Sequence, residues 1–243
     1  MNNLILLGAN GAIGSALIKE ALKNFNHIYA IDKKFNESIT SKKVTLITLD
    51  ILDPNAGKNI LSKITNTKYN FCIGFAQRPF VNIVPNKLTD DIVDALNVSL
   101  ISSLDIFEYL QKTLKIHSVF FLGSINSFLV CDQPLSYMIA KSSCDTAVKF
   151  ISKKFPNIIF INFILGLVNF DKKEDNFSTN QFKRKAAFAS IGLENIPDIK
   201  ELSITIIKIL LNSNQIMSGN EIYLDSGQHH TDSYWSARIS SAQ

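Results

Sequence analysis

Residues 4–22 read LILLGANGAIGSALIKEAL: a short apolar run, a turn with three glycines and then a good helix former. The glycines Gly8, Gly11 and Gly14 permit a tight turn, close approach of the backbone to a ligand, and close packing of helix against strand. The N-terminus of such a helix also carries partial positive charge. The order strand, glycine turn, helix therefore predicts a site for a pyrophosphate, with a purely structural corner as the alternative.

An acidic residue follows the second apolar run at the spacing that a dinucleotide site requires. Asp32 closes the run Ile28–Asp32, close to the roughly 20 residues downstream at which a carboxylate binds the ribose hydroxyls. A carboxylate there repels the extra phosphate of NADP, so Asp32 favours NAD. Lys33 and Lys34 follow directly, and either lysine could turn inward and accept NADP instead. The turn residues predicted to contact the cofactor are Gly8, Asn10, Gly11, Ala12, Ile13 and Gly14.

Short apolar runs recur along the chain without the alternation of strands that face water on one side. Such runs are typical of parallel strands covered by helices on both faces. The segments between them have helical spacing, most clearly in 90–114, 135–155 and 199–211. This alternation predicts one α/β domain over 1–243, a Rossmann-type doubly wound parallel sheet of about seven strands flanked by helices on both faces. The predicted strands are 4–7, 27–31, 44–49, 71–75, 119–122, 158–163 and 221–224.

Two segments lie outside this regular pattern. Residues 169–197 lack a clear strand signal, and we predict a substrate lid there. Residues 228–243 follow the last strand and its turn and are predicted to be a C-terminal tail. His229 and His230 lie in this tail without a set of further ligands, so no metal site is predicted.

Composition narrows the range of partners. The formal net charge of +4 is spread in short clusters, so no nucleic-acid partner is expected. Three scattered cysteines, Cys72, Cys131 and Cys144, have neither zinc-binding nor disulfide-framework spacing and favour a reducing, cytoplasmic environment. The longest apolar stretch, 158–168, is far shorter than the ~18 to 20 residues of a membrane span, so no membrane partner is expected.

Tyr137 and Lys141 form a candidate pair for proton transfer. They are four residues apart in a segment with helical spacing, which places both on one helix face. A free tyrosine has a pKa near ~10, and a neighbouring ammonium favours the phenolate, so such a pair can transfer protons near neutral pH. Ser124 stands thirteen residues before Tyr137, at the end of a predicted strand. Ligands bind at the carboxyl ends of parallel strands, so Ser124 and the glycine turn are predicted at one edge.

In this order, the glycine turn, Asp32, Asn97, Ser124 and the Tyr137–Lys141 pair resemble the short-chain dehydrogenase/reductase family over essentially the whole chain. Residues 218–227, SGNEIYLDSG, are similar to the family's closing strand and turn. The resemblance implies hydride transfer between a nicotinamide cofactor and a small secondary alcohol or carbonyl. Tyr137 would be the general acid in reduction and the general base in oxidation, and Ser124 would bind the substrate oxygen.

The resemblance implies further roles around this pair. Lys141 would bind the nicotinamide ribose and favour the phenolate of Tyr137, which also borders the cofactor. Asn97 would position a water that links the lysine to solvent. Asp50, Ile51 and Ala76, which follow the third and fourth predicted strands, are candidates for contact with the cofactor, although Asp50 could instead be a helix cap or turn residue. Family members commonly pair the helices corresponding to 90–114 and 135–155 between subunits, which implies a homodimer or homotetramer.

The chain departs from the family pattern at its cofactor turns. Leu7 replaces a threonine, and the spacing Gly8-x-x-Gly11-x-x-Gly14 is more usual in the family's longer, nucleotide-sugar branch. Phe75-Ala76-Gln77 replaces Asn-Asn-Ala-Gly, and Leu165-Gly166 replaces Pro-Gly. We assign the short, single-domain branch, because the longer one carries on the order of a hundred further residues for its substrate. A nucleotide-binding regulator without turnover, and a non-redox sugar-modifying epimerase or dehydratase with bound NAD, are the alternatives.

Overall fold

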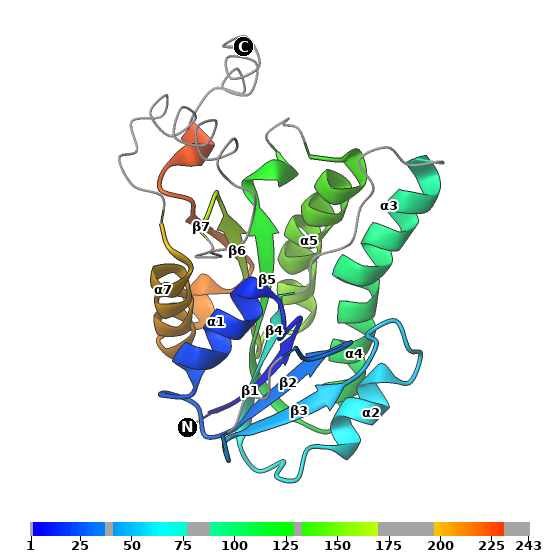
Figure 1. Ribbon diagram of the computed structural model, residues 1–243, viewed down its shortest axis with the longest axis vertical. Helices are drawn as coiled ribbons and strands as arrows, with labels where there is room; N and C mark the ends of the chain where they lie inside the picture. Colours follow the sequence, from blue (N-terminus) through cyan, green and yellow to red (C-terminus); the bar gives the residue numbers. More distant parts are fainter. Residues whose placement is uncertain (1, 37–40, 77–87, 129–132, 170–196, 231–243) are drawn as a thin grey trace.

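All seven strands pair in parallel in one sheet, in the order β3-β2-β1-β4-β5-β6-β7 (Figure 1). The computed structural model describes residues 2–36, 41–76, 88–128, 133–169 and 197–230. The strand order reverses between β1 and β4, which makes their carboxyl ends the switch point where open α/β sheets bind ligands. The strands are β1 (Asn2–Leu7), β2 (Ile28–Asp32), β3 (Val44–Thr48), β4 (Asn70–Phe75), β5 (Lys115–Ser124), β6 (Ile159–Leu165) and β7 (Asn220–Leu224). The predicted fold class and all seven predicted strands are confirmed.

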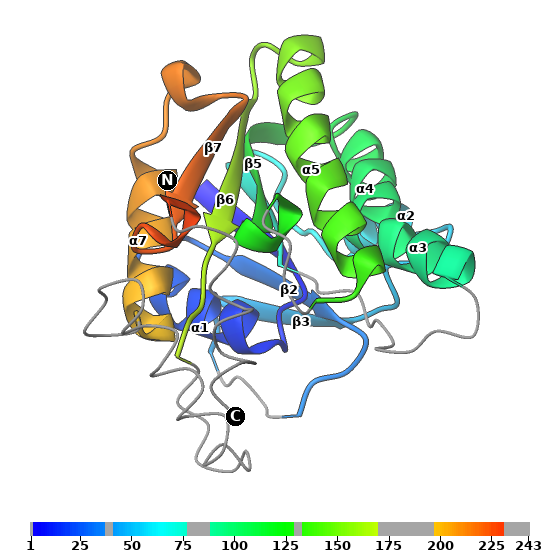
Figure 2. The ribbon, with the colours of Figure 1, turned by 90° about the horizontal axis from the view of Figure 1, so that it is seen from above.

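The helices cover the two faces of the sheet unequally (Figure 2). Helices α1 (Ala12–Ala21) and α7 (Ile199–Leu211) pack together on one face. The other face carries α2 (Ala56–Ser62), α3 (Leu88–Leu96), α4 (Ser102–Leu110) and α5 (Leu135–Lys154). The described residues also form short helical turns: η1 (Asn97–Ile101), η2 (Ile125–Ser127), η3 (Gln215–Met217) and η4 (Gln228–His230).

The strands lack apolar alternation because each of their faces is covered by helices. On the α5 side, Val119 and Phe121 of β5 join a core with Phe107 and Val148. On the α1 side, the intervening Phe120 of β5 joins a second core. Burial of one such side chain contributes roughly 1.5–3 kcal/mol. Because each face of the sheet has its own core, consecutive residues of a strand are apolar.

The long helix predicted over 90–114 is confirmed, with one irregularity. Helices α3 and α4 are joined end to end by η1, a π-helical turn in which the Ser102 N–H donates to the carbonyl of Asn97. A π-helical turn inserts an extra residue and is frequent at functional sites. This π-helical turn begins at the predicted catalytic asparagine.

Two features differ from the predicted alternation of strands and helices. Helix α2 was not predicted, because only its Ala56, Gly57 and Ile60 are buried, and three residues are too few for a periodic signal. The described residues between β2 and β3, 33–36 and 41–43, contain no helix, since this short polar connection has no apolar stripe to bury. Within the described ranges, no helix is both long and apolar enough to span a membrane.

Candidate active site

The glycine turn after β1 has the geometry that its residues predict. Gly8 adopts a left-handed backbone conformation with φ of 78°, which favours glycine. A Cβ on Gly14 would lie 2.1 Å from the carbonyl oxygen of Gly8 and 2.9 Å from the Cα of Ala9, so only glycine lets α1 pack this closely. No side chain caps the N-terminus of α1. Its first N–H groups therefore remain for an anion, and the turn fits a pyrophosphate.

Asp32 and Asn10 are brought together at the end of β2. The Asp32 carboxylate accepts the backbone N–H of Asn10 at 2.9 Å and that of Lys33 at 2.8 Å. The side-chain oxygen of Asn10 in turn accepts the backbone N–H of Asn36 at 3.2 Å. Asp32 is thereby fixed beside the glycine turn, where an acid is predicted to bind the ribose.

The other predicted cofactor residues follow neighbouring strand ends. The backbone N–H of Ala76 donates to Leu7 at 2.9 Å, which places Ala76 beside the start of the glycine turn. The Asp50 carboxylate accepts the Leu52 N–H at 3.0 Å and lies 3.0 Å from the Lys33 ammonium. Slight burial raises the pKa of Asp50, but the Leu52 hydrogen bond and Lys33 outweigh it, and the pKa falls below its ordinary value.

Lys141 reaches from α5 to the end of β5. Its ammonium donates to the carbonyl oxygen of Leu122 at 2.7 Å and lies 5.8 Å from the ring centre of Tyr137. β5 pairs with β4 only as far as Phe121, so Lys141 binds a carbonyl just beyond the end of that ladder. The predicted Tyr137–Lys141 pair therefore lies on one face of α5 and faces the strand that ends at Ser124.

The environment of Lys141 is costly for a cation. The residue is only 6% exposed, and the ion pairs among the described residues do not include it. Burial of an ammonium without a carboxylate partner is unfavourable. An ammonium has three N–H donors, so two remain beyond the one bound to Leu122.

Ser124 is the buried last residue of β5. Its hydroxyl accepts the Asn126 N–H at 3.3 Å. In the turn that follows, the carbonyl of Ser127 accepts the hydroxyl of Ser142, the residue after Lys141. These contacts hold the loop after Ser124 against the helix that carries Tyr137 and Lys141.

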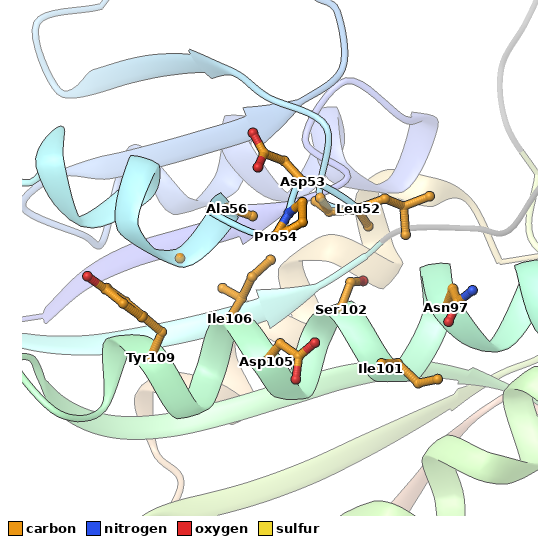
Figure 3. A pocket seen from close by; sticks show the side chains of 12 residues that line it. Leu52, Asp53, Pro54, Ala56, Asn97, Ile101, Ser102, Asp105, Ile106 and Tyr109 are labelled. Atoms are coloured by element: carbon orange, nitrogen blue, oxygen red, sulfur yellow. The ribbon is translucent and has the colours of Figure 1, made fainter.

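Asn97 is placed differently from the other three predicted catalytic residues. Its π-helical turn is packed on α5, where the Cys144 thiol contacts the carbonyl of Ser99 at 3.6 Å. Asn97 and Ile51 also line a cavity of about 390 Å³ between the 51–57 loop with α2 and the η1–α4 helix. Figure 3 shows Leu52, Asp53 and Pro54 on one side of this cavity and the helix with Asn97 on the other. The lining residues do not include Ser124, Tyr137 or Lys141, so the cavity joins Asn97 to none of the other three predicted catalytic residues.

A polar contact that the sequence did not predict joins β6 to α5. The fully buried Asn162 of β6 donates to the carboxylate of Asp145, one helical turn after Lys141. A Cβ on Gly123 would lie 2.9 Å from the Asn162 amide, so Gly123 allows this contact. Burial and the nearby Glu221 carboxylate raise the pKa of Asp145. The one signal in the sequence was Asn162 itself, a polar residue within an apolar run.

The C-terminal turn is a second feature that sequence reasoning missed. The buried Asp225 carboxylate accepts the backbone N–H of His229 at 2.7 Å and contacts its ring nitrogen at the same distance. The Gln228 side chain accepts the Leu167 N–H at 2.9 Å. Gln228, assigned to a surface tail, thus packs on the segment after β6, and His229, assigned to the same tail, packs on Asp225. The rest of the predicted tail, 231–243, lies outside the described residues.

The remaining predictions concern regions that the structure describes only in part. The ends of the predicted lid lie together, since the Asn169 N–H donates to Pro197 at 2.9 Å, but residues 170–196 are outside the described ranges. Cys72 and Cys144 are free and buried, and burial raises their pKa to about 11. Where the structure is described, no three His, Cys, Asp or Glu side chains group as metal ligands would.

Comparison with solved structures shows the fold. A 4-hydroxyisoleucine dehydrogenase complexed with NADH is 18% identical, with a TM-score of 0.80 over 96% of this chain and 100% of that one. L-sorbose reductase from Gluconobacter frateurii, complexed with NADPH and L-sorbose, is 12% identical, with a TM-score of 0.80 over 95% and 97%. A short chain dehydrogenase family protein from Francisella tularensis subsp. tularensis SCHU S4 is 18% identical, with a TM-score of 0.70 over 95% and 100%.

Comparison of sequences shows the family. No curated protein matches the chain. The profile of the NAD dependent epimerase/dehydratase family matches residues 4–168, which run from β1 and the glycine turn past β6. The chain therefore belongs to the NAD dependent epimerase/dehydratase family, and its fold is that of the short-chain dehydrogenase/reductases.

Proposed function

We propose that the protein is an NAD-dependent oxidoreductase that interconverts a small secondary alcohol and a carbonyl by hydride transfer. The observation that carries this proposal is the Lys141 ammonium, which is buried without an ion-pair partner among the described residues and lies 5.8 Å from the Tyr137 ring. Replacing this ammonium with an apolar side chain would remove its desolvation cost, so its burial favours a chemical role over a structural one.

The predicted catalytic residues have separate roles in proton transfer. During oxidation the Tyr137 phenolate accepts the proton of the substrate hydroxyl, and during reduction the phenol returns it to the substrate oxygen. The Ser124 hydroxyl binds that oxygen and fixes its distance from Tyr137. Lys141 stabilises the phenolate through its charge, and its two remaining N–H donors bind the ribose hydroxyls. Asn97, on the turn packed against α5, positions a water that connects Lys141 to solvent.

The cofactor site rests on the glycine turn and the strand ends beside it. Bound NAD would accept or supply the hydride, while the chain holds it in place. The backbone of Gly8, Asn10, Gly11, Ala12, Ile13 and Gly14 binds the pyrophosphate, and Asp32 binds the adenosine ribose. Asp50, Ile51 and Ala76 border the adenine side. The Asp32 charge disfavours the additional phosphate of NADP.

The proposal is tested by following NADH absorbance while secondary alcohols and ketones are screened. Tyr137→Phe should lower kcat/KM by about 10²–10⁴-fold, because it removes the proton donor and acceptor. NAD binding by calorimetry should change little. A variant as active as the wild type on every substrate turned over would contradict the assigned role.

A non-redox enzyme with bound NAD is the second candidate. The matched family includes epimerases and dehydratases, and the Gly8-x-x-Gly11-x-x-Gly14 spacing favours that branch. Such an enzyme would retain NAD through purification and regenerate it in each cycle. Product formed without net NADH would identify it, whereas tight NAD binding without any turnover would indicate a regulator.

We also propose a homodimer or homotetramer in which the α3–α4 and α5 surfaces meet a second copy. Large apolar side chains are exposed there, including Phe150 at 71%, Val93 at 54% and Ile101 at 47%. Large apolar side chains that are exposed on neighbouring helices are candidates for burial against a second copy. A cytoplasmic location is a further prediction, based on the absence of paired cysteine spacing in the sequence.

A further inference from the structure

The end of β2 carries opposite charges on adjacent residues, and the structure shows that the two point to different partners. Asp32 is bound to the glycine turn through the Asn10 N–H at 2.9 Å. The ammonium of Lys33 instead lies 3.0 Å from the Asp50 carboxylate, beyond the end of β3. The lysine that could neutralise a ribose phosphate is therefore engaged by another carboxylate.

Asp50 is itself held in place. Its other oxygen accepts the Leu52 N–H at 3.0 Å, which orients the carboxylate in the turn after β3. This hydrogen bond and the Lys33 charge lower the pKa of Asp50 against the opposing effect of burial, so the group is ionised at neutral pH. Asp50 is thus a fixed anionic partner for a long, flexible lysine.

We propose that Asp50 is a specificity-determining residue, which holds Lys33 away from the ribose position beside Asp32 and thereby disfavours NADP. This inference rests on the proposed nucleotide-binding function. A ribose phosphate carries close to two negative charges at neutral pH, as phosphate monoesters do. With Lys33 paired to Asp50, the nearest fixed charge that such a phosphate meets is the Asp32 carboxylate. Without Asp50, the Lys33 ammonium is released to bind the phosphate.

The expected change in nucleotide preference can be sized from the exposure of the Lys33–Asp50 ion pair. The Lys33 and Asp50 side chains are 60% and 47% exposed. Exposed ion pairs contribute at most about 1 kcal/mol, which corresponds to about fivefold in an equilibrium constant. We therefore expect a shift in nucleotide preference of about twofold to fivefold, and a smaller one at high salt because of screening.

The experiment measures dissociation constants of NADH and NADPH with the full chain, by nucleotide fluorescence titration. Asp50→Asn should lower the ratio of the NADPH to the NADH constant by about twofold to fivefold. Both nucleotides carry the same adenine, so the loss of an adenine contact would change both dissociation constants equally and leave their ratio unchanged. Asp53→Asn is the matched control: Asp53 lies in the same loop and accepts the Asn55 N–H at 2.8 Å, and the ion pairs of the described residues do not include it. Its ratio should equal that of the wild type.

A second substitution distinguishes the effect of the Lys33 ammonium on nucleotide preference from the effect of the Asp50 charge itself. Adding Lys33→Met to Asp50→Asn should restore the wild-type ratio, whereas adding Lys34→Met should not. A gain in NADPH affinity that persists without Lys33 would overturn the inference, because repulsion by Asp50 alone would then explain it. An unchanged ratio in Asp50→Asn would overturn it as well. Failure of the wild type to bind either nucleotide would instead refute the proposed function, and the inference with it.

Discussion

The Lys141 side chain is buried at a cost in desolvation, and the role proposed for it is chemical. Its one hydrogen bond among the described residues, to Leu122, satisfies a carbonyl beyond the β4–β5 ladder. A buried cation without an anionic partner does little for stability, because desolvation offsets what the hydrogen bond contributes. The residue is therefore expected to matter for catalysis far more than for folding.

Lys141→Met tests this separation. We expect the free energy of unfolding to fall by no more than about 1 kcal/mol, since the lost hydrogen bond is offset by relief of desolvation. Turnover should fall by about 10²-fold or more, because the phenolate and the ribose lose their cation. Urea unfolding and steady-state kinetics measure the two effects. A loss of several kcal/mol in stability would show that Lys141 is mainly structural.

We predict different effects for alanine substitutions at Gly14 and Gly11, which lie in the same turn. Gly14→Ala should destabilise the protein by about 1–3 kcal/mol and abolish nucleotide binding, because its Cβ would lie 2.1 Å from the Gly8 oxygen. Gly11→Ala should destabilise the protein less, since its Cβ would lie 3.3 Å from that oxygen, a tight contact that a small shift can relieve. Thermal unfolding and NADH titration compare the two. Equal effects would mean that backbone entropy, and not the close packing of α1, explains these glycines.

At the scale of elements, α5 is positioned by contacts on two sides. The Asn162–Asp145 hydrogen bond joins it to β6, and the π-helical turn at Asn97–Ile101 packs against it through Cys144. Both contacts lie about one helical turn from Lys141. The position of the predicted catalytic pair therefore depends on polar contacts between elements as well as on the apolar core.

Asp145 should make stability depend on pH. Its folded-state pKa is raised by burial and by Glu221, so the folded protein holds this proton more tightly than the unfolded chain does. By linkage, its contribution to stability falls as the pH rises from about 4, the ordinary pKa of an aspartate, through the raised value. Asp145→Asn keeps a hydrogen-bond acceptor and removes the titration. Urea unfolding at a series of pH values should show the variant gaining on the wild type as the pH rises, and a constant difference would contradict the assignment.

At the scale of the whole molecule, α3, η1 and α5 carry exposed large apolar side chains that the proposed assembly would cover. Phe150, Val93 and Ile101 remain exposed on the side of the sheet opposite α1 and α7. Burial of these side chains against a second copy would remove them from water. This surface, and not the sheet, is where subunits are expected to meet.

Phe150→Asp tests the proposed assembly. A charge in the proposed apolar interface should shift sedimentation from a dimer or tetramer to a monomer, whereas Lys200→Asp, at an exposed site of α7 on the opposite face of the sheet, should not. The fold should persist in both variants by circular dichroism, because neither residue is in a core. A wild-type protein that sediments as a monomer would refute the assembly.

The sequence by itself determined the seven strands, the glycine turn, the acid after β2 and the Tyr137–Lys141 spacing, because each depends on neighbouring residues with a short period. It did not reveal α2, whose buried face is too small to be periodic, or the π-helical turn at Asn97, which depends on packing against α5. Only the tertiary structure decided that Lys141 reaches Leu122, that Asn162 meets Asp145 and that Lys33 pairs with Asp50. These contacts join residues of different elements, and their partners are chosen by the way the strands and helices are packed.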